Sequence, residues 1–205
     1  MRVINHILIS LLMFVGCGSM FGKEPKGNPG QNEYHLLATS RTSTMEKEMN
    51  QAVKEGFSFK SVMGGDTFFA AKEMVVLMSR QNKRVQFEYL VLATNKTSTM
   101  EKEMRVAGEK KFKYKGQTVF ETMFGGQEIV VIMERDSSMP GSGYDYKLLA
   151  TKKTSTMLKE MNLEAAKGFK LVGLTVGDTT FGDQEVVTIM ERSLAGKFKK
   201  AGIGN

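Results

Sequence analysis

The chain has 205 residues, of which 29 are Lys or Arg and 22 are Asp or Glu, so its net charge is +7. An apolar fraction of 41% and a charged fraction of 25% are ordinary for a globular protein and exclude wholesale disorder or a collagen-like fibre. The single Cys excludes an internal disulfide and a zinc site with several cysteine ligands. The two His provide few side chains for a His-based metal or acid–base centre. We therefore predict no cofactor.

The first 16 residues have the features of a secretory signal peptide. Arg2 provides a positive charge, and residues 7–15 are apolar except for Ser10. A membrane-spanning helix needs about 20 apolar residues, so this run is too short to be one. We predict a signal peptide over residues 1–16 and an exported protein.

The only cysteine, Cys17, directly follows this apolar run. With Val15 and Gly16 before it, the segment resembles the lipobox of bacterial lipoproteins, although Phe14 stands where Leu is usual. The resemblance implies a lipid on Cys17 and a membrane anchor. Cleavage just after Cys17 and an uncleaved anchor are the alternatives. Gly, Pro and Asn are frequent in the next part of the chain, which predicts a flexible tether over 17–31.

Internal repetition dominates the rest of the chain. The strings YHLLATSRTSTMEKEM, YLVLATNKTSTMEKEM and YKLLATKKTSTMLKEM begin at Tyr34, Tyr89 and Tyr146, so the copies are offset by 55 and then 57 residues. The predicted units are repeat 1 (32–80), repeat 2 (86–135) and repeat 3 (143–192), followed by a basic tail (193–205).

Within a repeat the hydrophobic period changes from strand to helix and back to strand. In repeat 1, residues 34–39 form a short apolar run, and residues 45–53 carry Met and Val at helical spacing. Over 57–61, Phe57, Phe59 and Ser61 alternate with polar residues, which predicts a half-exposed strand. Residues 74–78 are apolar on both faces and need cover on both sides. The unit is therefore β-α-β-β, and the fold class is α+β.

Two rules order the strands of each sheet. The second and third strands form a hairpin, so they pair antiparallel. The first and second strands are joined through a helix, so they should run parallel with a right-handed crossover. Placing the third strand between them gives the order 1-3-2, with the lysine-bearing second strand at an edge, where lysines discourage further pairing. A unit of this size is marginal alone, so we expect the repeats to pack on one another.

The helix starts and ends carry local signals. Ser43 and Glu46 have the spacing of a capping box, whereas the third copy has Leu158 in place of the glutamate. Gly56 and Gly168 stand where a left-handed residue ends a helix. Lys111 occupies that place in the second copy, which predicts a slightly strained or differently ended helix there.

A first strand that contains Tyr34, a helix that ends in Gly56-Phe57 and a last strand that ends in Arg80 together resemble the DUF4177 family, which consists of small bacterial domains of unknown function. That family usually has Trp where this chain has Phe57. The resemblance extends over all three repeats. It implies a β-α-β-β unit and a bacterial origin, and it brings no activity and no catalytic residues.

Pairs of methionines four residues apart suggest two interpretations. Soft thioethers suit Cu(I), but Met also fills irregular cores well, and the helix face that carries these residues is the one that must be buried. We favour core packing and assign no metal ligands. The helical pairs are Met45 and Met49, Met100 and Met104, and Met157 and Met161.

A Thr-Ser-Thr triplet begins the predicted helix of every repeat. Backbone amides at a helix start can bind an anion, so these nine residues are candidate anion ligands, and simple capping is the competing interpretation. The candidates are Thr42, Ser43, Thr44, Thr97, Ser98, Thr99, Thr154, Ser155 and Thr156.

No nucleophile elbow, phosphate-binding loop or dinucleotide fingerprint is present in the sequence. The positive charge is spread along the chain, so we predict no nucleic-acid partner and expect attraction to lipid headgroups or envelope polymers. We hypothesise a non-catalytic, lipid-anchored protein of the bacterial cell envelope that acts as a binding or scaffolding module for an unknown envelope protein or polymer. A small-ligand protein that binds copper or an anion is the alternative, and a hydrolase is the third choice.

Overall fold

The computed structural model of the chain describes residues 33–66, 72–81, 86–121, 127–138, 141–178 and 184–195. These residues belong to one compact unit, Asn32–Asn205. The predicted signal peptide, the predicted tether with Cys17, and the predicted basic tail beyond Ala195 lie outside the described residues. Among the described residues, no helix is long and apolar enough to cross a bilayer.

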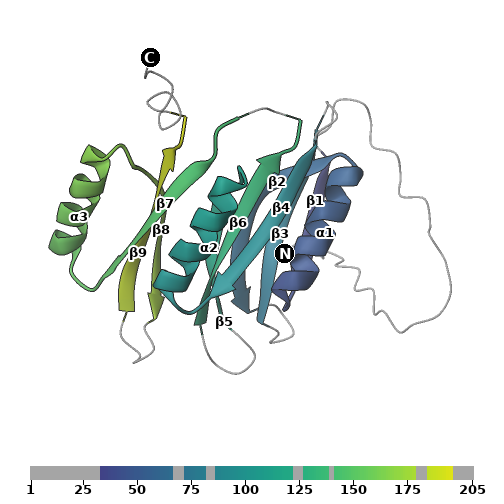
Figure 1. Ribbon diagram of the computed structural model, residues 1–205. Helices are drawn as coiled ribbons and strands as arrows, with labels where there is room; N and C mark the ends of the chain where they lie inside the picture. Colours follow the sequence, from purple (N-terminus) through teal and green to yellow (C-terminus); the bar gives the residue numbers. More distant parts are fainter. Residues whose placement is uncertain are drawn as a thin grey trace, which may run out of the picture. The chain divides into compact units, whose positions relative to one another are not determined.

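Each repeat folds as strand, helix, strand, strand (Figure 1). Repeat 1 contains β1 (Tyr34–Thr39), α1 (Thr42–Lys54), β2 (Phe57–Asp66) and β3 (Lys72–Arg80). Repeat 2 contains β4 (Phe87–Thr94), α2 (Thr97–Glu109), β5 (Lys113–Glu121) and β6 (Gln127–Asp136). Repeat 3 contains β7 (Tyr144–Thr151), α3 (Thr154–Ala166), β8 (Lys170–Asp178) and β9 (Gln184–Ser193).

The predicted strand order is confirmed in every repeat. The three sheets have the orders β1-β3-β2, β4-β6-β5 and β7-β9-β8. Each central strand is antiparallel to both of its neighbours, so the first and second strands of a repeat run parallel to each other, on opposite edges. The strand that the sequence makes apolar on both faces is therefore the central one, and the fold is α+β.

The methionines of the helices lie in the core, as the packing interpretation predicts. In α1, Met45 and Met49 are fully buried, and they contact Met74, Val76 and Met78 of the central strand in one cluster. The apolar stripe at helical spacing thus covers one face of the helix's own sheet. The equivalent residues of the other helices are the buried Met100, Met104 and Met157 and the partly buried Met161.

The predicted capping box is wrong. Helix α1 begins at Thr42, its N-cap residue is Arg41 in an extended conformation, and no side chain caps it. Ser43 therefore lies inside the first turn, and the Glu46 carboxylate accepts a hydrogen bond from the Val91 amide of the next repeat at 3.0 Å. Helix α2 also has no side-chain cap, and its equivalent glutamate likewise contacts the following repeat.

The helix ends agree with the prediction. Gly56 and Gly168 have φ angles of 93° and 89°, in the left-handed region that glycine adopts without strain. Lys111 adopts the same conformation with a φ of 70°, although it has a Cβ atom. The second repeat therefore ends its helix in the same way at a conformational cost.

The second strand does not alternate without interruption. Phe57 and Phe59 are buried, as predicted, but the pairing with β3 shifts between Phe59 and Ser61. Lys60 is the extra residue of this bulge, so Val62 packs against the core and Ser61 is exposed. The prediction that Ser61 shares the inner face is therefore wrong. The other two sheets have a bulge at the equivalent place.

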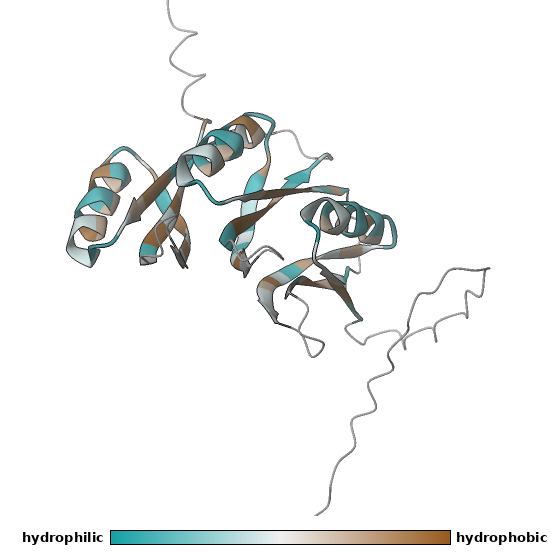
Figure 2. Cartoon of the chain, turned by 90° about the horizontal axis from the view of Figure 1, so that it is seen from below, coloured by the Kyte–Doolittle hydropathy of each residue, from teal (hydrophilic) through white to brown (hydrophobic). Residues whose placement is uncertain are grey.

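The cores of the first two repeats are each completed by the following repeat. We call the face of a sheet that is turned away from its own helix the back face. The core of repeat 1 includes Tyr89, Val130 and Ile132 from the back face of the second sheet, with Val91 and Ala93 packed against it. The core of repeat 2 includes the equivalent back-face residues of the third sheet. Figure 2 shows apolar segments in the strands of every sheet and mixed colours along the helices.

Candidate functional site

Polar side chains of α1 reach the first strand of repeat 2. The Asn50 side-chain amide donates to the Tyr89 carbonyl and accepts from the Tyr89 amide, both at 2.9 Å. Glu46 accepts from the Val91 amide two residues further along β4. Because β4 is an edge strand, these contacts satisfy backbone groups that no other strand pairs with in the described sheet.

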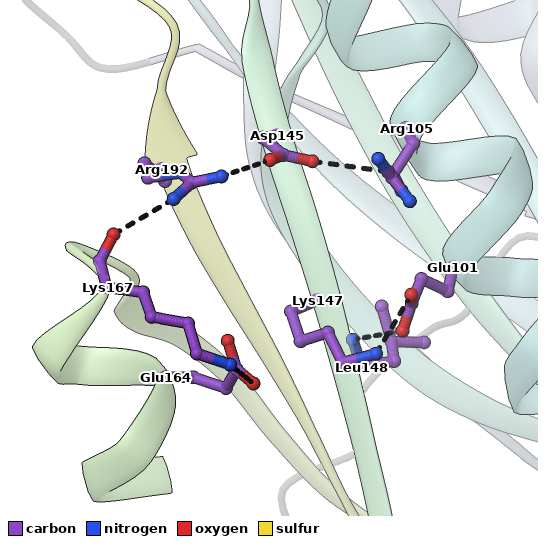
Figure 3. Close-up of polar contacts among 8 residues, drawn as sticks. All are labelled: Glu101, Arg105, Asp145, Lys147, Leu148, Glu164, Lys167 and Arg192. Carbon is purple, nitrogen blue, oxygen red and sulfur yellow. Dashed lines mark hydrogen bonds and ion pairs between the residues drawn. The ribbon is translucent and has the colours of Figure 1, made fainter. Parts of the chain in front are cut away.

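The junction between repeats 2 and 3 uses the same two helix positions, of which one keeps its glutamate and the other has arginine in place of asparagine (Figure 3). The Glu101 carboxylate accepts from the Leu148 amide at 3.0 Å and from the Lys147 ammonium at 3.1 Å. Arg105 occupies the place of Asn50 and pairs with Asp145 at 3.2 Å. The carboxylate of Asp145 is thereby shared between Arg105 of α2 and Arg192, the residue before the end of β9.

One buried tyrosine closes each junction. The Tyr89 hydroxyl donates to the Glu134 carboxylate at 2.7 Å and accepts from the Phe59 amide of repeat 1 at 2.8 Å. Burial raises the pKa of the Tyr89 phenol, and the nearby Glu134 charge raises it further. Tyr146 contacts Glu191 and the Tyr114 amide in the same way at the second junction. A phenol held protonated in this way is a structural hydrogen-bond donor.

An arginine with a fixed set of contacts ends each repeat. In repeat 3, the Arg192 guanidinium lies 4.2 Å from the centre of the Phe169 ring, donates to the Lys167 carbonyl at 3.0 Å and pairs with Asp145 at 2.6 Å. This cluster ties the helix end, the first strand and the last strand together. The equivalent sets are Arg80 with Phe57, Glu55 and Glu33, and Arg135 with Phe112, Lys110 and Glu88.

An open groove of about 900 Å³ lies beside α2 in repeat 2. Its lining combines apolar side chains with charges of both signs and two hydroxyls, which is the mixture that small-molecule sites use for contact area and orientation. The apolar lining residues are Leu90, Leu92, Val106, Ala107 and Phe112. The polar ones are Glu88, Ser98, Thr99, Lys102, Glu103, Lys110 and Arg135.

The candidate anion ligands lie at the helix starts, where the sequence predicts them. The first residues of the three helices are Thr42, Thr97 and Thr154, and the serine that follows each of them is exposed. The second triplet contributes Ser98 and Thr99 to the groove, beside Lys102. Anion binding at these residues stays a prediction.

The described residues contain no cluster of three or more His, Cys, Asp or Glu side chains that could hold a metal ion. The thioethers of Met45, Met49, Met100 and Met104 are fully buried in the core. Their packing among apolar side chains favours a core role over copper coordination at these positions.

No family model, curated protein or solved structure matches this chain. The residues at the junctions are the ones that sequence reasoning missed. Asn50 and Arg105 lie on the helix face that is solvent-facing in a single repeat, and the spacing of Glu46 from Ser43 predicts a local cap instead of a contact with the next repeat. The available signal is that the position of Asn50 is Arg105 in the second copy, and that the position of Glu46 is Leu158 in the third.

Proposed function

We propose that this chain is a non-catalytic exported protein of the bacterial cell envelope, anchored through a lipid on Cys17 and acting as a binding or scaffolding module. The observation that carries the proposal is the order of parts along the chain. A short apolar run is followed at once by the sole cysteine, then by a Gly- and Pro-rich segment, and the three repeats begin only after it. A lipid with a tether would hold the repeats away from the membrane surface.

The structure supports a binding role through the use of its polar side chains. Successive repeats are joined by four polar side chains of the helices, namely Glu46, Asn50, Glu101 and Arg105. The buried Tyr89 phenol is held by hydrogen bonds within the first junction. These groups join the three repeats into one array of similar surfaces. Such an array suits recognition of an envelope protein or polymer over several repeats.

Labelling with radioactive palmitate in a bacterial host tests the anchor. We expect the wild-type chain to incorporate label into the membrane fraction and Cys17→Ala to incorporate none. Ser19→Ala, two residues away, serves as the matched control and should keep the label. Equal labelling of the wild type and Cys17→Ala would overturn lipidation at this residue.

A small-ligand function is the second candidate, because the groove beside α2 joins apolar contact area to Lys102, Lys110 and Arg135. Isothermal titration with inorganic phosphate tests it, and Lys102→Ala should weaken any binding at least tenfold, whereas the equivalent Lys47→Ala in repeat 1 should not. Titration with Cu(I) tests the copper version, and binding weaker than about micromolar would end it.

A further inference from the structure

Most of the large apolar side chains that stay exposed lie at the two ends of the repeat array. Three lie on the back face of the first sheet or on its edge strand, and four of the five on repeat 3 form a second group. The first group is Tyr34, Leu36 and Met63, and the second is Leu158, Leu171, Leu174 and Val176. The two remaining ones among the described residues, Val106 and Leu163, occupy equivalent positions on α2 and α3.

The back face of the first sheet is equivalent to surfaces that are buried in the other repeats. Tyr34 is 58% exposed, whereas its equivalents Tyr89 and Tyr146 are 2% and 1% exposed. Leu36 is 64% exposed, whereas Leu148 at its place in repeat 3 is 7% exposed. Register pairs Leu36 with Leu77 and Ala38 with Val75, so these residues share one apolar face with Tyr34. In repeats 2 and 3 the helix of the preceding repeat packs against this face.

Repeat 3 presents the opposite half of the same interface. Phe59 of repeat 1 is 8% exposed because the second sheet packs on it, whereas its equivalent Leu171 is 47% exposed. Val62 packs into the core of repeat 1, whereas its equivalent Leu174 is exposed. No fourth repeat follows among the described residues to cover this side. Terminal repeats of solenoid proteins usually carry a polar outer face instead.

The polar residues of the interface also have counterparts at the two ends. Asn162 occupies the position of Asn50 on α3 and is exposed, and Tyr34 occupies the position of Tyr89. The bidentate contact between Asn50 and Tyr89 could therefore form again between Asn162 and Tyr34. Leu158 stands where a glutamate binds the next strand in the other helices, and it is exposed, as Leu36 is, so an apolar contact between the two would replace that hydrogen bond if the ends of two copies met.

We propose that a second copy of this chain covers each end, so that the back face of the first sheet packs against α3 and β8 of its neighbour. The interface repeats the one that joins repeats 1 and 2 and repeats 2 and 3. It uses different surfaces on the two copies, so the assembly is heterologous and grows into an open chain or closes into a ring. The inference deepens the scaffolding role proposed above and rests on it in one respect: it names a second copy of this chain as the partner of the scaffold.

Sedimentation velocity of the compact unit Asn32–Asn205 over a broad concentration series tests the proposal. We expect the mean mass of the wild type to rise with concentration beyond a dimer. Leu36→Glu and Leu174→Glu each place a charge on one end, so each alone should weaken association at least tenfold and leave a monomer. Asn95→Glu adds the same charge to an exposed loop of repeat 2 and should assemble like the wild type. Circular dichroism confirms that each variant is folded.

Mixing the two charged variants distinguishes the head-to-tail contact from a symmetric one. Leu36→Glu keeps an intact repeat 3 end, and Leu174→Glu keeps an intact first sheet, so an equimolar mixture should form a one-to-one dimer and nothing larger. A symmetric contact between two first sheets would leave Leu174→Glu fully associated with itself and would give no mixed dimer with Leu36→Glu. Either that pattern or a wild type that stays monomeric throughout would overturn the proposal.

The chain from Gly18 to Asn205 tests whether the segment before the repeats is the occupant instead. If Asn32–Asn205 assembles and the longer chain stays monomeric, the amino-terminal segment covers the first sheet and the proposal fails for the exported protein. Assembly of both chains supports it. Neither chain carries Cys17, so these results are independent of the palmitate experiment, and the two proposals can fail separately.

Discussion

Replacing Tyr89 by Phe isolates what one hydroxyl contributes to the junction between repeats. The ring of Tyr89 stays in the core of repeat 1, and only the oxygen that joins Glu134 to the Phe59 amide is removed. The chain contains its own control, because Tyr34 occupies the equivalent position in the first repeat and is largely exposed. The two substitutions are chemically identical and differ in what surrounds the oxygen.

The size of the effect depends on the groups left behind. A buried amide that loses its partner costs about 1–3 kcal/mol, and a hydrogen bond to a charged group contributes about 1.5–3 kcal/mol. Glu134 keeps its ion pair with Lys115 at 3.2 Å, so part of the second contribution is retained. We therefore expect Tyr89→Phe to lower the free energy of unfolding by about 2–4 kcal/mol. In the monomeric chain, Tyr34→Phe should change it by less than about 0.5 kcal/mol.

Urea denaturation followed by far-ultraviolet circular dichroism measures both values, since the chain contains no Trp to report by fluorescence. Thermal unfolding should show a decrease of roughly 5–15 °C for Tyr89→Phe. Tyr146→Phe should behave like Tyr89→Phe, because its hydroxyl makes the equivalent contacts at the second junction. If Tyr89→Phe and Tyr34→Phe unfold at the same urea concentration, the junction hydrogen bonds do not stabilise the array and the reasoning is refuted.

Three further predictions concern pH and backbone geometry. Burial raises the pKa of the Tyr89 and Tyr146 phenols above the ordinary value of 10.0, so the folded chain keeps protons that the unfolded chain releases. These groups should not change the free energy of unfolding below pH 10, and above pH 10 each tyrosine should lower it by about 1.4 kcal/mol per pH unit. Urea midpoints measured against pH test this, and a profile that stays flat above pH 10 would contradict it. Gly108→Ala should destabilise the chain by about 1–3 kcal/mol despite the better helix propensity of Ala, because the added Cβ atom would lie 2.3 Å from the Tyr144 carbonyl oxygen. A higher melting temperature would show that the backbone around Tyr144 moves away from the added atom at no cost. Lys111→Gly should stabilise it by about 1 kcal/mol by relieving the left-handed conformation, and a lower melting temperature would argue against strain there.

The architecture of one repeat could be predicted because its signals are local. The switch from period 2 to helical spacing, the glycine at the helix end and the doubly apolar last strand each depend on a few neighbouring residues. The order 1-3-2 then resulted from two connection rules. The bulge after Phe59 is missed because Ser61 is taken to continue the alternation, whereas the two successive polar residues Lys60 and Ser61 before Val62 mark the inserted residue.

The contacts between repeats could not be assigned, because their signals resemble local ones. Glu46 stands three residues after a serine at a helix start, which fits a capping box, yet its partner is the Val91 amide, 45 residues away. Asn50 looks like an ordinary exposed helix residue until β4 is placed beside it. The nine candidate anion ligands lie at the helix starts, as predicted, but the sequence has no feature that distinguishes an occupied helix start from an empty one.

Differences between the copies depend on position in the array. The glutamate that binds the next strand is present in the two helices that have a repeat after them, and Leu158 replaces it in the third. If the last helix faced only water, a charged or polar residue would suit that position better than Leu. An exposed Leu there, at the opposite end from the exposed Leu36, is understandable if both are buried when copies meet. The departures from the repeat are therefore more informative about assembly than the repeat itself.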